Sequence, residues 1–168
     1  MSMTTYEPTN MQVAGYVDVA IGAGFANVNT PKLSELTMLV TCAIQGVTST
    51  TNLQATSQQG LCNKDAYDVL RSRTRTLEQL IFKGDGAASE TAFLALVAEE
   101  ALAGMFVRPY KRSVKEGGTA LAVGDKGDAY NFKVGSLDRG PVAVGGEWTY
   151  VVTSTEVKRS SLNVALIA

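Results

Sequence analysis

The sequence contains no histidine, and this absence excludes several classes of catalytic and metal site. A chain without histidine cannot carry a Ser-His-Asp or Cys-His catalytic site, a His-ligated zinc or a haem held by a proximal histidine. The residue that most often transfers protons near pH 7 is missing as well. We therefore expect a protein that is not an enzyme, with no catalytic residues, no cofactor and no metal site.

Charge is scarce and balanced in sign. Charged residues make up 18% of the chain, and 15 Lys and Arg face 16 Asp and Glu, for a net charge of −1. This balance excludes a polybasic nucleic-acid binder and a polyacidic disordered tail. Apolar runs are all shorter than the roughly 20 residues of a membrane-spanning helix, and the polar start does not resemble a signal peptide. We expect no membrane anchor and folding in the cytoplasm of the producing cell.

The length of 168 residues and the apolar content of 45% predict one domain, residues 1–168, with a hydrophobic core. Two cysteines, Cys42 and Cys62, are too few for a disulfide scaffold. The hydrophobic pattern of residues 1–31 is weak, and glycines followed by Pro31 interrupt it. This segment is interpreted as an N-terminal arm.

Sixteen glycines and many Ser and Thr residues favour β structure with turns. Alternation of apolar and polar residues or β propensity predicts strands over residues 36–45, 47–56, 73–82, 105–112, 130–134, 147–158 and 162–168.

A single helix is expected over residues 89–103. Ser89 is a suitable N-cap, and Gly104 suits the position just after the helix. The helical period aligns an apolar stripe formed by Phe93, Leu96, Val97 and Leu102. The sum predicts a mainly β fold: a β-sandwich or partly closed barrel of about seven strands with one flanking α-helix.

Two of the expected strands carry a face rich in Thr and Ser. Residues 47–56 and 149–155 have few charges and little apolar content on one side. Such a face is costly in a dry core but suits contact with water. A sheet that lines an aqueous channel has this composition. The candidate lumen-facing residues are Thr48, Thr50, Thr149 and Thr153.

Basic residues form two clusters, the first comprising Arg71, Arg73 and Arg75 and the second Arg108, Lys111 and Arg112. One interpretation is a stripe that follows nucleic-acid phosphates. The other is a strand edge or interface stripe that pairs with acidic residues, and the balanced total charge favours it. These six residues are the candidate inter-subunit contacts.

The order of elements from Leu36 to Ala168 resembles that of the tail tube proteins of long-tailed bacteriophages. The resemblance lies in the strand TMLVTCAIQGVTSTTNLQAT, the segment TRTLEQLIFKGDG, the helix SETAFLALVAEEALAG with the strand MFVRPYKR, and the closing AVGDKGDAYNFKVGSLDRGPVAVGGEWTYVVTSTEV. It implies a β-sandwich with one helix on its flank. It also implies a structural subunit of the virion tail.

The same family implies hexameric rings that stack into a hollow tube. A tape-measure protein first fills the channel, and double-stranded DNA later passes through it during genome ejection, without sequence-specific binding. Tail terminator or tip proteins are the implied partners at the tube ends. One feature departs from the family, whose bores tend to be acidic: the expected strands carry no clear acidic stripe.

Two alternatives remain open from the residues. A small-ligand-binding or adaptor β-barrel would be monomeric or dimeric and would enclose an apolar cavity. An enzyme would have to work with carboxylates alone, for example Asp125 and Asp128. Formation of rings or filaments distinguishes a tube protein from both.

Overall fold

The computed structural model describes residues 17–41, 44–58, 67–83, 88–109, 111, 117–140 and 149–168. Within them, seven antiparallel strands form one sheet in the order β2-β1-β5-β6-β7-β4-β3. The elements are β1 (Val17–Gly22), η1 (Leu33–Glu35), β2 (Met38–Leu39), β3 (Ile44–Gln58), β4 (Tyr67–Lys83), α1 (Ala88–Leu96), β5 (Leu102–Pro109), β6 (Lys126–Arg139) and β7 (Thr149–Ala165).

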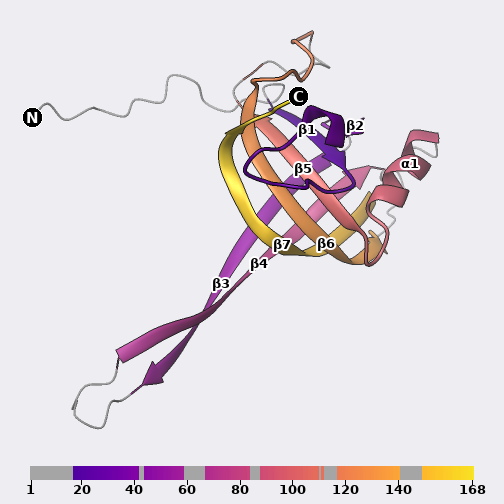
Figure 1. Cartoon of the computed structure of the whole chain (residues 1–168). Coiled ribbons are helices and arrows are strands. Elements are labelled where there is room, and N and C mark those ends of the chain that lie inside the picture. The colour runs from indigo at the N-terminus through magenta and orange to yellow at the C-terminus, as the bar shows by residue number, and fades with distance from the viewer. Residues whose placement is uncertain are drawn as a thin grey trace, which may run out of the picture.

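The sheet curls, and α1 lies against one of its sides (Figure 1). The predicted mainly β fold with about seven strands and one flanking helix is therefore confirmed. Of the two predicted architectures, the partly closed barrel agrees with the observed arrangement, because the described strands belong to one curled sheet.

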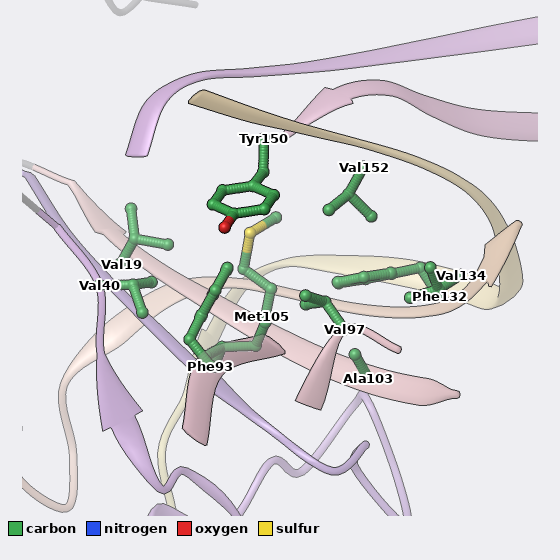
Figure 2. Packing of buried hydrophobic residues seen from close by; sticks show 11 residues of the cluster. Val19, Val40, Phe93, Val97, Ala103, Met105, Phe132, Val134, Tyr150 and Val152 are labelled. Carbon is green, nitrogen blue, oxygen red and sulfur yellow. The ribbon is translucent and has the colours of Figure 1, made fainter. Parts of the chain in front are cut away.

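The main core lies between the sheet and α1 together with the residue that follows it. Phe93 on α1 and Val97 just after it are buried, as the helical stripe predicted, and Figure 2 shows them among side chains from the strands. The strands and the segment after β2 contribute Val19, Ile21, Val40, Ala103, Met105, Phe132, Val134, Tyr150 and Val152. Tyr150 also donates a hydrogen bond to Glu90 Oε1 at 2.6 Å, which joins β7 to α1.

The helix is shorter than predicted, and its expected end was wrong. It ends at Leu96, and the chain turns so that Glu100 adopts a left-handed φ of 66°. The Glu100 N–H then donates to the Val134 carbonyl at 3.0 Å, so pairing with β6 replaces the last helical turns. Leu102 consequently begins β5 and is 45% exposed instead of buried.

Gly104, predicted to follow the helix, lies within β5. A Cβ atom at this position would lie 2.9 Å from the Cα of Gly24. The absence of a side chain therefore allows the loop after β1 to approach β5 closely.

The strand predicted over residues 36–45 is interrupted. Met38 and Leu39 form β2 at one edge of the sheet, whereas β3 begins at Ile44 at the other edge. The Thr41 hydroxyl accepts a hydrogen bond from the Val19 N–H at 2.9 Å, so a side chain takes the place of a backbone ladder contact. The continuous alternation in the sequence hides this change of edge. Cys42 and Cys62 lie outside the described residues.

Part of the expected N-terminal arm belongs to the sheet. Val17–Gly22 forms β1 between β2 and β5. Phe25 and Val28 are buried in a second cluster, which also contains Phe106, Ala129 and Leu166. An arm could therefore include only residues 1–16, which lie outside the described residues.

The hairpin of β3 and β4 extends beyond the rest of the sheet. The ladder between β4 and β7 runs from Lys83 opposite Thr149 to Thr76 opposite Thr155. The ladder between β3 and β4 continues to Gln58 opposite Tyr67. Residues 51–58 and 67–75 therefore form a two-stranded extension, here called the ribbon, which projects from the sheet (Figure 1).

Candidate functional site: one polar face of the sheet and the ribbon

The side chains of β7 alternate between the core and the opposite face of the sheet. Tyr150, Val152 and Ser154 are buried on the core face. Thr149 and Thr153, two of the candidate lumen-facing residues, occupy the alternate positions and are half-buried. Successive residues of a strand point to opposite faces, so both threonines lie on the face away from the core.

The register places Thr48 and Thr50 on that same face. Thr50 pairs with Thr76, which in turn pairs with Thr155 of β7. Thr48 lies two residues before Thr50 on β3. Directly paired residues of neighbouring strands share a face, as do residues two apart in one strand. The structure thus brings the four candidate threonines onto one face, here called the hydroxyl face; its position in a bore stays a prediction.

Strand β6 adds further polar groups to the hydroxyl face. The hydroxyls of Ser136 and Thr153 are 2.6 Å apart, and the Ser136 hydroxyl also lies 2.9 Å from Asp138 Oδ2. Lys133 is half exposed and forms an ion pair with Glu100. Lys133 and Asp138 are opposite in charge, so the described residues of β6 add no acidic stripe to this face.

The two faces of the ribbon differ in charge. Asn52 opposite Thr74 and Gln54 opposite Ser72 continue the hydroxyl face without a charged residue. The other face carries Arg73 opposite Leu53 and Arg75 opposite Thr51. Arg71 has no partner in the ladder, because the register shifts between the pairs Gln54–Ser72 and Ala55–Leu70. Arg73 and Arg75, which were predicted to contact another subunit, thus occupy positions on the face opposite the threonines.

Arg108, in contrast, is buried within its own subunit. Its guanidinium forms ion pairs with Asp18 of β1 and Asp125, and both Arg108 and Asp18 have no exposed surface. It also donates to the carbonyl oxygen of Thr119 at 2.8 Å. This burial corrects the expectation that Arg108 contacts another subunit, because its charged atoms are already bound inside the fold.

The remaining members of the second basic cluster differ in position. Lys111 forms an ion pair with Asp125, and its side chain is 53% exposed. Arg112 lies outside the described residues. The buried group of Asp18, Arg108 and Asp125 is not among the sites predicted from the sequence. Each of two apolar strands carries a single charged residue, Asp18 in VDVAIG and Arg108 in MFVRP. Two such charges of opposite sign can pair in the interior, and this pattern was the signal available in the sequence.

The carboxyl group of Asp125 has a pKa below its ordinary value. Burial raises this pKa, but hydrogen bonds from Lys111, Arg108 and the Ala122 N–H outweigh burial by stabilising the carboxylate. A lowered pKa in the folded state stabilises the fold at every pH above the unfolded value, about 4. This stabilisation is lost as the pH falls from about 4 through the lowered pKa.

We therefore expect the variant Asp125→Asn to be less stable than the wild type at pH 7 and to lose less stability on acidification. Urea unfolding at pH 7 and pH 3 measures both free energies. The gap between the two proteins should narrow at pH 3, because the unfolded wild-type chain binds a proton at Asp125 below about pH 4, which favours unfolding of the wild type. A gap that is the same at both pH values would contradict this account of Asp125.

A surface hollow of about 730 Å³ lies beside the ends of β5 and β6. It is lined by Val107, Pro109, Lys111, Gly124, Lys126, Gly127, Asp128 and Asn163. This mixed, charged lining differs from the apolar cavity expected of a ligand-binding barrel. Asp128 accepts a hydrogen bond from the Asn163 N–H at 2.9 Å, and Asp125 binds the cationic side chains of Arg108 and Lys111. Each carboxylate therefore has a partner within the fold.

The described part of the chain offers neither a metal-binding cluster nor a membrane-spanning helix. Its Cys, Asp and Glu side chains form no group of three or more that could hold a metal ion. Within the same residues, no helix is both long and apolar enough to cross a membrane.

Comparisons with known proteins place the chain in a family. The sequence model of a family described as phage tail tube protein matches residues 3–168. No curated protein matches this sequence significantly. One similar solved structure is described as the tail of an empty GTA particle with C6 symmetry. It is 12% identical with a TM-score of 0.45, and the match covers 73% of this chain and 83% of that chain. The family match confirms the resemblance found from the sequence: the chain belongs to the phage tail tube protein family and is a structural component of a virion tail.

Proposed function

We propose that the chain is the repeating subunit of the tube, forming hexameric rings that stack around a hollow channel for genome ejection. The observation that carries this proposal is the asymmetry of the sheet. One face holds the main core, whereas the other bears aligned Thr residues over β3, β4 and β7 and a second buried cluster, with Phe106 and Ala129, over β5 and β6. A subunit that lines an aqueous bore requires this division between its two faces.

The ribbon supports self-association. Residues 51–58 and 67–75 pair with each other, and their ladder to β7 has already ended at Thr76. An isolated two-stranded hairpin is at best marginally stable in water. Strand β3 is also the last strand of the sheet order, so its outer edge has no partner strand within the described subunit. Pairing with a neighbouring subunit satisfies both the ribbon and this edge.

The hydroxyl face suits the passage of DNA. Phosphates bind proteins chiefly through Lys and Arg, which release counterions from the nucleic acid. The paired positions Thr50–Thr76–Thr155 and Asn52–Thr74 carry no charge, and Lys133, which lies opposite Thr155, is paired with Glu100. These positions therefore provide no strong binding site. In the proposed tube, this face lines the bore, where the tape-measure protein lies before DNA passes without sequence-specific binding.

The proposed role is structural and requires no catalysis. Tail terminator or tip proteins contact the rings at the two tube ends, and assembly takes place in the host cytoplasm. The single domain uses residues 1–16 as an arm that reaches an adjacent subunit. Lys111, Arg112 and the arginines of β4 contribute to contacts between subunits.

Sedimentation velocity and negative-stain electron microscopy of the full chain, over a range of protein and salt concentrations, test this proposal. We expect rings and stacked filaments, whose abundance rises with protein concentration. Deletion of residues 1–12 should reduce the fraction of stacked rings, whereas the melting temperature of the subunit should change little. A chain that stays monomeric at high concentration in every salt condition would contradict the tube. Filaments unchanged by the deletion would contradict only the arm.

A further inference from the structure

The two arginine positions of the ribbon have no acidic partner in their own ladder. Arg73 pairs with Leu53 and Arg75 pairs with Thr51, so neither arginine position lies directly opposite an acidic residue. Directly paired residues are the closest neighbours across a β-ladder, and opposite charges there stabilise each other. This face of the ribbon is therefore basic at Arg73 and Arg75, and its one acidic position in the described ladder is Asp68, opposite Ser57 near the end of the ladder.

The register also shows on which side this basic face lies. Leu77, two residues after Arg75, pairs with Ser154, which is buried on the core face of the sheet. The positions of Arg73 and Arg75 thus continue the core face, whereas Asn52 and Thr74 continue the hydroxyl face. If the hydroxyl face lines a bore, the two arginines lie on the side away from the DNA. Protein, and not nucleic acid, is then the partner that they meet.

An exposed pair of carboxylates is available on the same chain. Glu99 and Glu100 lie in the turn between α1 and β5, and the side chain of Glu100 is 75% exposed. Its ion pair with Lys133 is solvent-exposed on both sides and is therefore weak. Figure 1 shows α1 and the ribbon on opposite sides of the sheet, so the ribbon extends away from the turn of its own subunit.

We propose that the face of the ribbon carrying Arg73 and Arg75 binds the Glu99–Glu100 turn of a second copy of this chain. This inference rests on the proposed tube and names one of its contacts. Two different surfaces on opposite sides of a subunit make a head-to-tail contact, which closes into a ring when the rotation between copies permits. Arginine and carboxylate groups form the strongest side-chain ion pairs, often through two parallel hydrogen bonds.

A charge-reversal experiment on the full chain tests the contact. The double variant Arg73→Glu/Arg75→Glu should raise the protein concentration needed for assembly by at least about tenfold, which corresponds to about 1.4 kcal/mol. Its monomer should melt as the wild type does. The variant Glu99→Arg/Glu100→Arg should be impaired in the same way. A chain with all four reversals should regain assembly, because the charges are again complementary.

Two controls keep the result interpretable. Lys32→Glu/Lys126→Glu changes the same total charge at exposed positions outside the proposed contact and should assemble like the wild type. Arg73→Gln/Arg75→Gln removes charge without adding repulsion and should weaken assembly less than the reversal, which provides a second measurement if the reversed ribbon fails to fold.

The outcomes separate this inference from the proposed function. Normal assembly of both ribbon variants would overturn the contact, and so would a folded four-reversal chain that fails to regain assembly. Loss of DNA binding with unchanged assembly would overturn it in favour of a nucleic-acid surface. Failure of the wild type to form rings would instead contradict the tube itself.

Discussion

Replacing Arg108 with methionine is expected to lower the free energy of unfolding by about 3–5 kcal/mol. The side chain has no exposed surface, and its guanidinium binds the carboxylates of Asp18 and Asp125. Its removal leaves two carboxylates without their buried counterion and also withdraws a hydrogen bond from the Thr119 carbonyl. Urea or thermal unfolding of the purified variant measures the loss.

Lys111→Met is the matched control for this prediction, because Lys111 binds the same Asp125 but is half exposed. Only the lysine end of this pair is exposed, and Asp125 keeps Arg108 as a partner when Lys111 is replaced, so the control should lose about 1 kcal/mol and stay much closer to the wild type. If Arg108→Met were equally close, the buried ion pairs would not stabilise the fold as described.

Shortening the ribbon is expected to abolish tube formation while the subunit remains folded. Thr50 and Thr76 face each other in the ladder, so an Asn-Gly turn can join them in place of residues 51–75. The ladder between β4 and β7, which begins at Thr76, stays intact. The variant should sediment as a monomer and keep a cooperative melting transition, because the lost segment serves contacts between subunits.

A second hairpin variant localises this effect. Gln58 and Tyr67 also face each other, and an Asn-Gly turn between them replaces only residues 59–66. This variant keeps the paired strands of the ribbon, with both of its faces, and should still assemble. Tubes formed by the variant that lacks residues 51–75 would show that the ribbon is dispensable.

Periodicity predicted well the elements whose environment is local. Burial of Phe93 and Val97 followed from the helical stripe, and the alternation around Thr149 and Thr153 correctly predicted a two-faced strand. The shared face of Thr48 and Thr153 was within reach of the sequence for the same reason. Each strand exposes one polar side, and a sheet aligns such sides.

Contacts between distant segments limited the rest of the prediction. The helix ends early because β6 binds the backbone of Glu100, more than 30 residues before its partner Val134. Arg108 is buried because β1 places Asp18 opposite it, 90 residues away in the sequence. Neither partner is visible in the local pattern of apolar and polar residues. The same holds for Thr41, whose hydrogen bond to Val19 spans 22 residues.

A three-dimensional reconstruction by electron cryomicroscopy of the particles formed by the full chain tests the central claim most directly. The account predicts a hollow tube of stacked rings in which Thr149, Thr153 and the paired positions Thr50 and Thr76 face the bore, and in which each ribbon contacts a neighbouring subunit. A tube with the hydroxyl face on its outer surface, or a subunit that forms no ring, would contradict it.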